Sequence, residues 1–141
     1  MLSAATFTHP LPRALPQNDA ARLFLLGVRR MGAHGLNDAH AAEAFMTTFG
    51  ASFLRPLLAM RVMMNELAAT ASTPITIAPC CCARMTGAEA ALIDITSRIR
   101  DQPHTAHILM ADLIGNKQVD GVLATMALVA SAFADLGKPI R

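Results

Sequence analysis

The chain has 141 residues, of which 53% are hydrophobic and 16% are charged, and its net charge is +2. This length fits one domain that can bury a core without disulfides or metal, and so small an excess of positive charge argues against nucleic acid as a partner. The aromatic residues are six Phe, without Tyr or Trp, and because strands favour β-branched and aromatic side chains, the composition favours helices.

The beginning of the chain is predicted to be an extended arm. Residues 1–17 contain Pro10, Pro12 and Pro16 and show little periodicity, so we expect an N-terminal arm followed by a single helical domain over 18–141. The arm lacks the basic start and apolar run of a signal peptide. The longest uncharged apolar stretch, 121–134, is shorter than the roughly 20 residues of a transmembrane helix. We therefore expect a cytoplasmic protein with no membrane partner.

Two helices are predicted in the first third of the chain. Asn18 or Asp19 can cap a helix that runs to about His34, and Asn37 or Asp38 can cap a second that runs to about Phe49. The inward residues expected in the second helix are Ala42, Met46 and Phe49. A solvated face, rather than a nucleic-acid site, is expected for the arginines of this half of the chain: Arg22, Arg29, Arg30, Arg55 and Arg61.

The third helix has the clearest apolar stripe. It is expected over about 52–71, with its first turn near Leu54 because Pro56 fits only in a first turn. The stripe consists of Phe53, Leu57, Met60, Met64 and Leu67. Two prolines and alternating β-branched residues then predict an extended connector over 72–85, with a short strand as an option that has no obvious partner.

Three more helices are predicted after the connector. Thr86 and Glu89 have the spacing of a capping box and begin a helix that runs to about Arg100. Pro103 fits the first position of a fifth helix that ends near Ile114. A sixth, over about 118–136, is apolar or small on all faces, so it is either the central helix or a dimer contact. The predicted fold is all-α: a compact bundle of five to six short helices with an extended Cys-bearing connector.

Cys80, Cys81 and Cys82 are the most unusual residues of the chain. Thiolates are soft ligands for a thiophilic metal ion such as zinc or copper. In an extended segment, however, Cys80 and Cys82 point one way and Cys81 the other, so they could share one ion only through a tight turn. Arg84 and a helix start lie close by, which also suits a reactive or redox-sensing thiol. Small hydrophobic residues that pack a loop are an equally good interpretation.

Histidines offer two further candidate sites. His104 and His107 lie on one face of the predicted fifth helix and could bind a metal, alone or together with the cysteines, although a pair at the edge of the core is the more ordinary interpretation. Around the turn between the first two helices lies a polar cluster of His34, Asp38, His40 and Glu43. Helix caps and exposed polar side chains explain this cluster better than a metal site or a shallow enzyme pocket.

Three segments resemble a small bacterial family of uncharacterised proteins. They are 21–40, which contains Arg29-Arg30-Met31-Gly32-Ala33-His34-Gly35; 78–86, which contains Ala78-Pro79-Cys80-Cys81-Cys82; and 132–137. The resemblance implies a compact single-domain protein and supplies no reaction, ligand or catalytic residue.

The sequence thus predicts two kinds of function. No catalytic motif is found, so an enzyme is less expected than a non-enzymatic interaction or structural module that self-associates, as a homodimer, through an apolar helix face. A further protein partner is also compatible with such a face. The alternative is a thiol-based metal-binding or redox-sensing protein that uses Cys80, Cys81 and Cys82.

Overall fold

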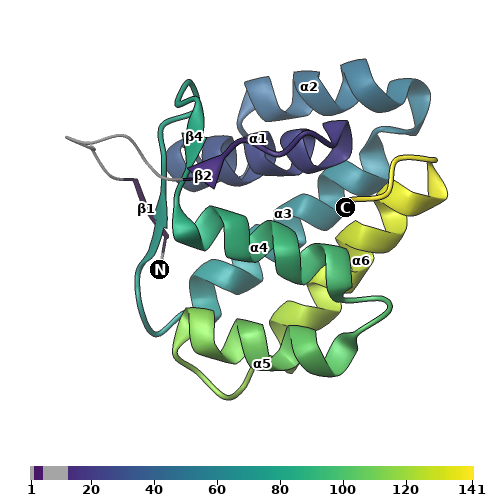
Figure 1. Cartoon of the computed structure of the whole chain (residues 1–141). Helices are drawn as coiled ribbons and strands as arrows, with labels where there is room; N and C mark the ends of the chain where they lie inside the picture. Colours follow the sequence, from purple (N-terminus) through teal and green to yellow (C-terminus); the bar gives the residue numbers. More distant parts are fainter. Residues whose placement is uncertain (1, 5–12) are drawn as a thin grey trace.

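The computed structural model describes residues 2–4 and 13–141, and over these residues the chain forms six α-helices and four short strands (Figure 1). The helices are α1 (Asp19–His34), α2 (Ala39–Phe49), α3 (Leu54–Thr70), α4 (Gly87–Arg98), α5 (Pro103–Ile114) and α6 (Asp120–Asp135). A short 3-10 helix, Gly50–Ser52, precedes α3. The prediction of a helical bundle with a connector that carries the cysteines is confirmed.

The capping residues explain where several helices begin. Asn18 accepts a hydrogen bond from the backbone N–H of Ala21 (2.8 Å), and Asp38 accepts one from that of Ala41 (2.9 Å). Each side chain satisfies an N–H group that has no partner within its helix. At α4 the capping box predicted from Thr86 is present, with a 3.0 Å hydrogen bond from the backbone N–H of Glu89 to the Thr86 hydroxyl.

The centre of the bundle is the contact between α3 and α6, the most extensive contact between elements of the described chain. The predicted stripe of α3 is buried from Leu57 to Leu67, whereas Phe53 before the helix is half-buried. Met126 of α6 is buried as well. Helix α1 approaches α3 closely at Gly27, where a Cβ atom would lie 2.7 Å from the Met60 Cε atom. The absence of a side chain at Gly27 therefore allows this packing distance.

Three phenylalanines join α2 to α6. The Phe133 ring meets the Phe45 and Phe49 rings edge-on, with centroids 5.8 and 5.2 Å away, an arrangement that aromatic rings favour. Phe45 is fully buried, whereas Met46 is 51% exposed. The prediction that Met46 faces inward is therefore wrong: the buried face of α2 is rotated by one residue toward Ala41 and Phe45.

The strands connect the beginning of the chain to the connector. β1 (Leu2–Ala4) pairs in parallel with β3 (Ile75–Ile77), and β2 (Arg13–Ala14) pairs antiparallel with β4 (Arg84–Met85). The short strand that the sequence allowed as an option in the connector is thus present, and its partner, which the sequence did not indicate, comes from the arm. Residues 1 and 5–12 of the predicted arm lie outside the described residues.

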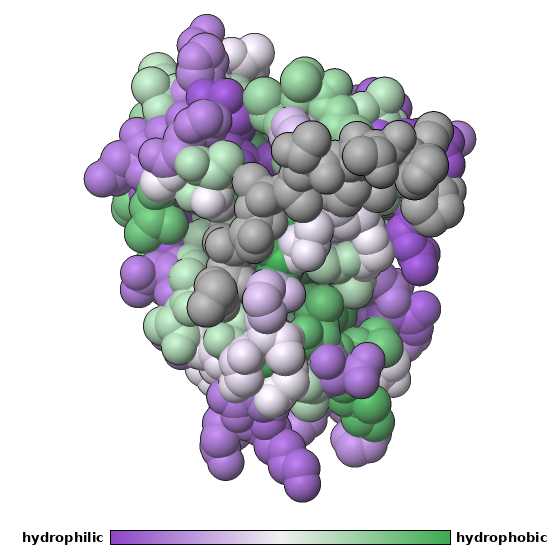
Figure 2. All heavy atoms as spheres, turned by 90° about the vertical axis from the view of Figure 1, so that its left-hand side faces the viewer, coloured by the Kyte–Doolittle hydropathy of each residue, from purple (hydrophilic) through white to green (hydrophobic). Residues whose placement is uncertain are grey.

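Figure 2 views the molecule from the side of these strands. Hydrophilic residues gather at the upper left, along the right and at the bottom of this face, and hydrophobic residues show in separate areas at the top, on the left and toward the lower right. None of the described helices combines the length and the hydrophobicity that crossing a bilayer requires.

Candidate functional site

The three cysteines lie in a tight turn between β3 and β4. The backbone N–H of Cys82 donates to the carbonyl oxygen of Pro79 over 3.0 Å, which closes a four-residue turn with Cys80 and Cys81 at its tip. Both tip cysteines are exposed, Cys82 is half-buried, and all three are free thiols. The connector is therefore not extended throughout, because the cysteines occupy the place where it reverses direction.

A buried ion pair holds this turn against the bundle. The Arg29 guanidinium on α1 binds the Glu89 carboxylate on α4 through two hydrogen bonds of 2.7 and 3.0 Å, and the two side chains are 3% and 0% exposed. Arg29 also donates to the carbonyl oxygens of Cys82 (2.8 Å) and Arg84 (2.7 Å). Glu89 in turn accepts from the backbone N–H groups of Ala78 (3.1 Å) and Thr86 (2.9 Å). One ion pair thus fixes the backbone on both sides of the cysteines.

A second arginine reaches the tip of the turn. The Arg30 Nη1 atom lies 3.6 Å from the Cys80 sulfur, and the same guanidinium makes two hydrogen bonds, of 3.0 and 2.9 Å, to Asp38. These bonds from Arg30 lower the pKa of the Asp38 carboxyl to about 2, and the N–H of Ala41 adds to the effect. Asp38 therefore stays charged at neutral pH and orients Arg30 toward Cys80.

Two of the cysteines share a small concavity beside α1. Cys80 and Cys82 line this space of about 130 Å³ together with Arg22, Arg29 and three leucines. The leucines are Leu15, Leu25 and Leu26. Cys81 is not part of the lining, so the turn presents two thiols to one side.

The histidine pair lies on another part of the molecule. His104 is exposed near the beginning of α5, and the nearest charged partner of His107 is Asp120, 3.9 Å away. Figure 1 shows α5 and β4 toward opposite ends of the bundle. Within residues 2–4 and 13–141, no three His, Cys, Asp or Glu side chains are grouped so that they could hold a metal ion. The histidine pair and the cysteine turn are therefore separate features of the described chain.

The predicted polar cluster is divided by the structure. Asp38 caps α2 and binds Arg30, as described above, and His34 is exposed at the end of α1. His40 and Glu43 lie on the exposed side of α2, where they line an open groove with Arg22. His34 and Asp38 do not line that groove, so the four side chains do not converge on one cavity.

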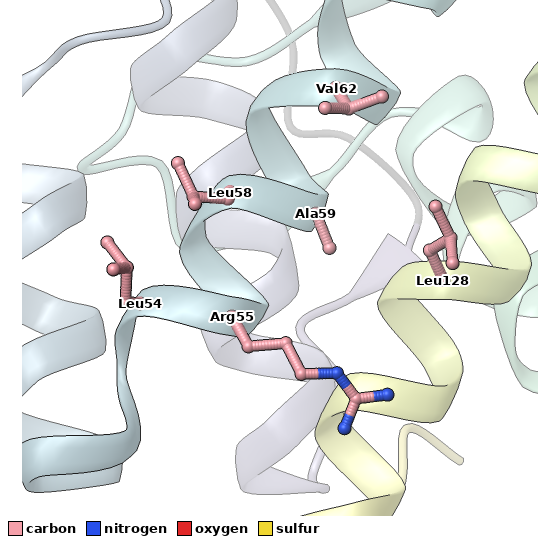
Figure 3. A pocket seen from close by; sticks show the side chains of 6 residues that line it. All are labelled: Leu54, Arg55, Leu58, Ala59, Val62 and Leu128. Atoms are coloured by element: carbon pink, nitrogen blue, oxygen red, sulfur yellow. The ribbon is translucent and has the colours of Figure 1, made fainter.

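An apolar groove of about 570 Å³ runs along the outer side of α3 (Figure 3). Leu54, Leu58 and Val62 follow one another at intervals of one helical turn, and Leu128 faces them from α6. These four side chains are 45–55% exposed. Ala59 forms the floor between the two helices, and Arg55 extends toward α6 at one end. Helix α3 is therefore apolar on two faces, one in the core and one in solvent.

Comparison with known proteins gives one match. A model of a family of unknown function (DUF6628) matches residues 3–128. The chain belongs to this family. The match includes the cysteine turn and both arginines that contact it, whereas the segment 132–137 lies beyond it. No curated protein and no solved structure matches the chain.

The sequence of this DUF6628 member did not reveal the roles of Arg29, Arg30 and Glu89. Arg29 was expected on a solvated face, and this prediction is wrong, because Arg29 is buried. Glu89 was singled out only for the capping box, although its carboxylate is also buried and binds Arg29. One signal was present: Arg29 lies four residues after Leu25 and directly after Val28, both of which are buried. Its position on α1 therefore falls inside the apolar arc, where a charge requires a buried partner.

Proposed function

We propose that this chain is a non-enzymatic helical interaction module that self-associates through the groove between α3 and α6. The observation that carries the proposal is the exposed row of Leu54, Leu58 and Val62 opposite Leu128. Binding of a partner that removes such contiguous apolar side chains from water is favourable through the hydrophobic effect.

The shape of the groove suits another α-helix. Ala59 leaves room between Val62 and Leu128, and side chains one turn apart on an entering helix could fit into this space. The exposed row of α3 has the same one-turn spacing. Two copies of α3 could therefore pack against each other, with the side chains of each copy in the groove of the other.

The charges at the edge of the groove favour a second copy of the chain over an unrelated partner. Arg55 of α3 and Asp135 of α6 form an ion pair of 2.8 Å, and both side chains are more than half exposed. A two-fold axis places a given patch against itself. An edge with one positive and one negative charge can satisfy this condition, because Arg55 of one copy can bind Asp135 of the other.

A stable dimer buries roughly 600 Å² or more of each partner. The four groove side chains would form the centre of such a contact, with neighbouring exposed residues of α3 and α6 around them. An anchor of this kind predicts that single charges in the groove prevent dimer formation.

Sedimentation equilibrium of the purified chain and of three variants tests the proposal. We expect a dimer for the wild type, and monomers for Leu58→Glu and Leu128→Glu, because each variant places a carboxylate in the buried contact. Ile108→Glu is the matched control, because Ile108 is also an exposed apolar residue (56%) but lies on α5 outside the groove. A wild-type chain that remains monomeric at the highest soluble concentration would refute the proposal, as would monomers of the control variant.

A further inference from the structure

We propose that the cysteine turn is a redox site in which Cys80 reacts with a hydroperoxide and Cys82 then forms a disulfide with it, while Arg30 positions the reacting groups. This redox site lies outside the groove between α3 and α6, so its chemistry does not depend on self-association.

Cys80 has the surroundings of a reactive thiol. Its side chain is exposed, so a small oxidant can reach it. The Arg30 guanidinium lies 3.6 Å from the sulfur and is held there by two hydrogen bonds to Asp38. Cysteines that react with oxidants are partly exposed and lie near positive charge, because the thiolate is the nucleophile.

Cys82 is the cysteine that can complete the reaction. It lines the same concavity as Cys80, whereas Cys81 does not. A disulfide needs Cα atoms about 4.4–6.8 Å apart, a range that two residues separated by one other can reach in a turn. Cys82 is also held in place, because Arg29 binds its carbonyl oxygen. Cys81 remains at the exposed tip, outside the lining that this pair shares.

The chemistry balances with a hydroperoxide as the oxidant. The Cys80 thiolate attacks one peroxide oxygen, the O–O bond breaks, and the other oxygen leaves as hydroxide or alkoxide. The resulting sulfenic acid is attacked by the Cys82 thiol, whose proton leaves with the sulfenic oxygen as water. The two sulfurs together lose two electrons, and the peroxide gains them. An N–H group of Arg30 can donate to the leaving oxygen, which is the reason to expect a peroxide.

Hydrogen peroxide with mass spectrometry tests this inference on the full chain. We expect the wild type to lose two of its three thiols, with a Cys80–Cys82 disulfide in the peptide map that dithiothreitol reverses. Cys81→Ser is the matched control and should form the same disulfide at the same rate. Cys82→Ser should stop at a sulfenic acid on Cys80 that dimedone traps, and Cys80→Ser should form no sulfenic acid.

The role of Arg30 has a separate readout. We expect Arg30→Met to slow the reaction of Cys80 with peroxide by about tenfold or more, because it removes a charged hydrogen-bond donor from the sulfur. Arg30→Lys should restore part of the rate, and circular dichroism should be unchanged in both variants. The inference is wrong if the native thiols react no faster than in urea, if the disulfide contains Cys81 or links two chains, or if Arg30→Met reacts at the wild-type rate.

Discussion

The ion pair between Arg29 and Glu89 should be the most sensitive polar contact of the fold. Glu89 is fully buried and accepts four hydrogen bonds, two from Arg29 and one each from the N–H groups of Ala78 and Thr86. Glu89→Gln keeps the size of the side chain but leaves the Arg29 charge buried without a counter-charge. Breaking a buried pair in this way costs about 3–5 kcal/mol, a large part of the roughly 5–15 kcal/mol that stabilises a domain.

The same pair allows a test of coupling. Arg29→Met alone should also cost about 3–5 kcal/mol, because it leaves the Glu89 carboxylate without its counter-charge and two carbonyl oxygens without donors. In the double variant Arg29→Met/Glu89→Gln no buried charge remains, and glutamine is a residue that capping boxes also use at this position. The double variant should therefore be more stable than the sum of the two single changes predicts, by about 2 kcal/mol.

Urea unfolding followed by far-UV circular dichroism measures these free energies for the wild type and the three variants. The slope of the free energy with urea should stay constant, which shows that the unfolded states are comparable. Single changes of less than about 1 kcal/mol, or values that add within about 0.5 kcal/mol, would refute the argument that burial makes this pair critical.

Three further predictions concern other contacts. The Asp38 carboxyl should titrate by NMR with a pKa of about 2, and in Arg30→Met this pKa should move toward its usual 3.8. Because folding lowers the pKa, the stability that Asp38 adds is present above about pH 4 and is lost as the pH falls through 2. An unchanged titration in the variant would contradict this. Asp94→Ala removes an exposed ion pair with Arg98 and should lower the free energy of unfolding by no more than about 0.5 kcal/mol. A loss as large as that of Glu89→Gln would show that exposure does not explain the difference in strength between the two ion pairs. Phe133→Ala should cost about 3–5 kcal/mol in the same assay because it empties the centre of the ring cluster, and a smaller cost would mean that Phe45 and Phe49 collapse into the space.

Local signals were enough to predict the helices. The stripe of α3, the capping box at Thr86 and the proline at the start of α5 depend on residues within one or two turns of each other, and all are found in the structure. Met46 shows the limit of such signals. A short helix such as α2 has several apolar residues on adjacent faces, and only its packing against α6 decides which of them is buried.

Long-range pairing could not be predicted in the same way. The partner of β3 lies more than 70 residues earlier, at Leu2–Ala4. The alternating β-branched residues of the connector indicate an extended segment but do not identify its partner. The partner of Arg29 is 60 residues later. A sequence pattern can show that Arg29 lies in an apolar arc, but only the meeting of α1 and α4 identifies Glu89 as its partner.

For the candidate site, the sequence correctly singled out the cysteines as unusual. It could not give their arrangement, because the turn is held by hydrogen bonds that Arg29 donates to backbone carbonyl oxygens and that Glu89 accepts from backbone N–H groups. Backbone groups have no sequence signature. The apolar face of α3 is a similar case. Leu54, Leu58 and Val62 are typical core residues by type, and only the position of the other helices leaves them exposed.

The hydrogen bonds of the Arg29–Glu89 pair also have a consequence for folding. Arg29 of helix α1 is synthesised 60 residues before Glu89, so a nascent chain that ends within the connector contains the arginine but lacks the carboxylate that binds it. Glu89 can bind the N–H groups of Ala78 and Thr86, on the two sides of the cysteines, only after α4 has docked on α1. A reaction that depends on the native geometry of Cys80 and Cys82 would therefore indicate that α1 and α4 have assembled.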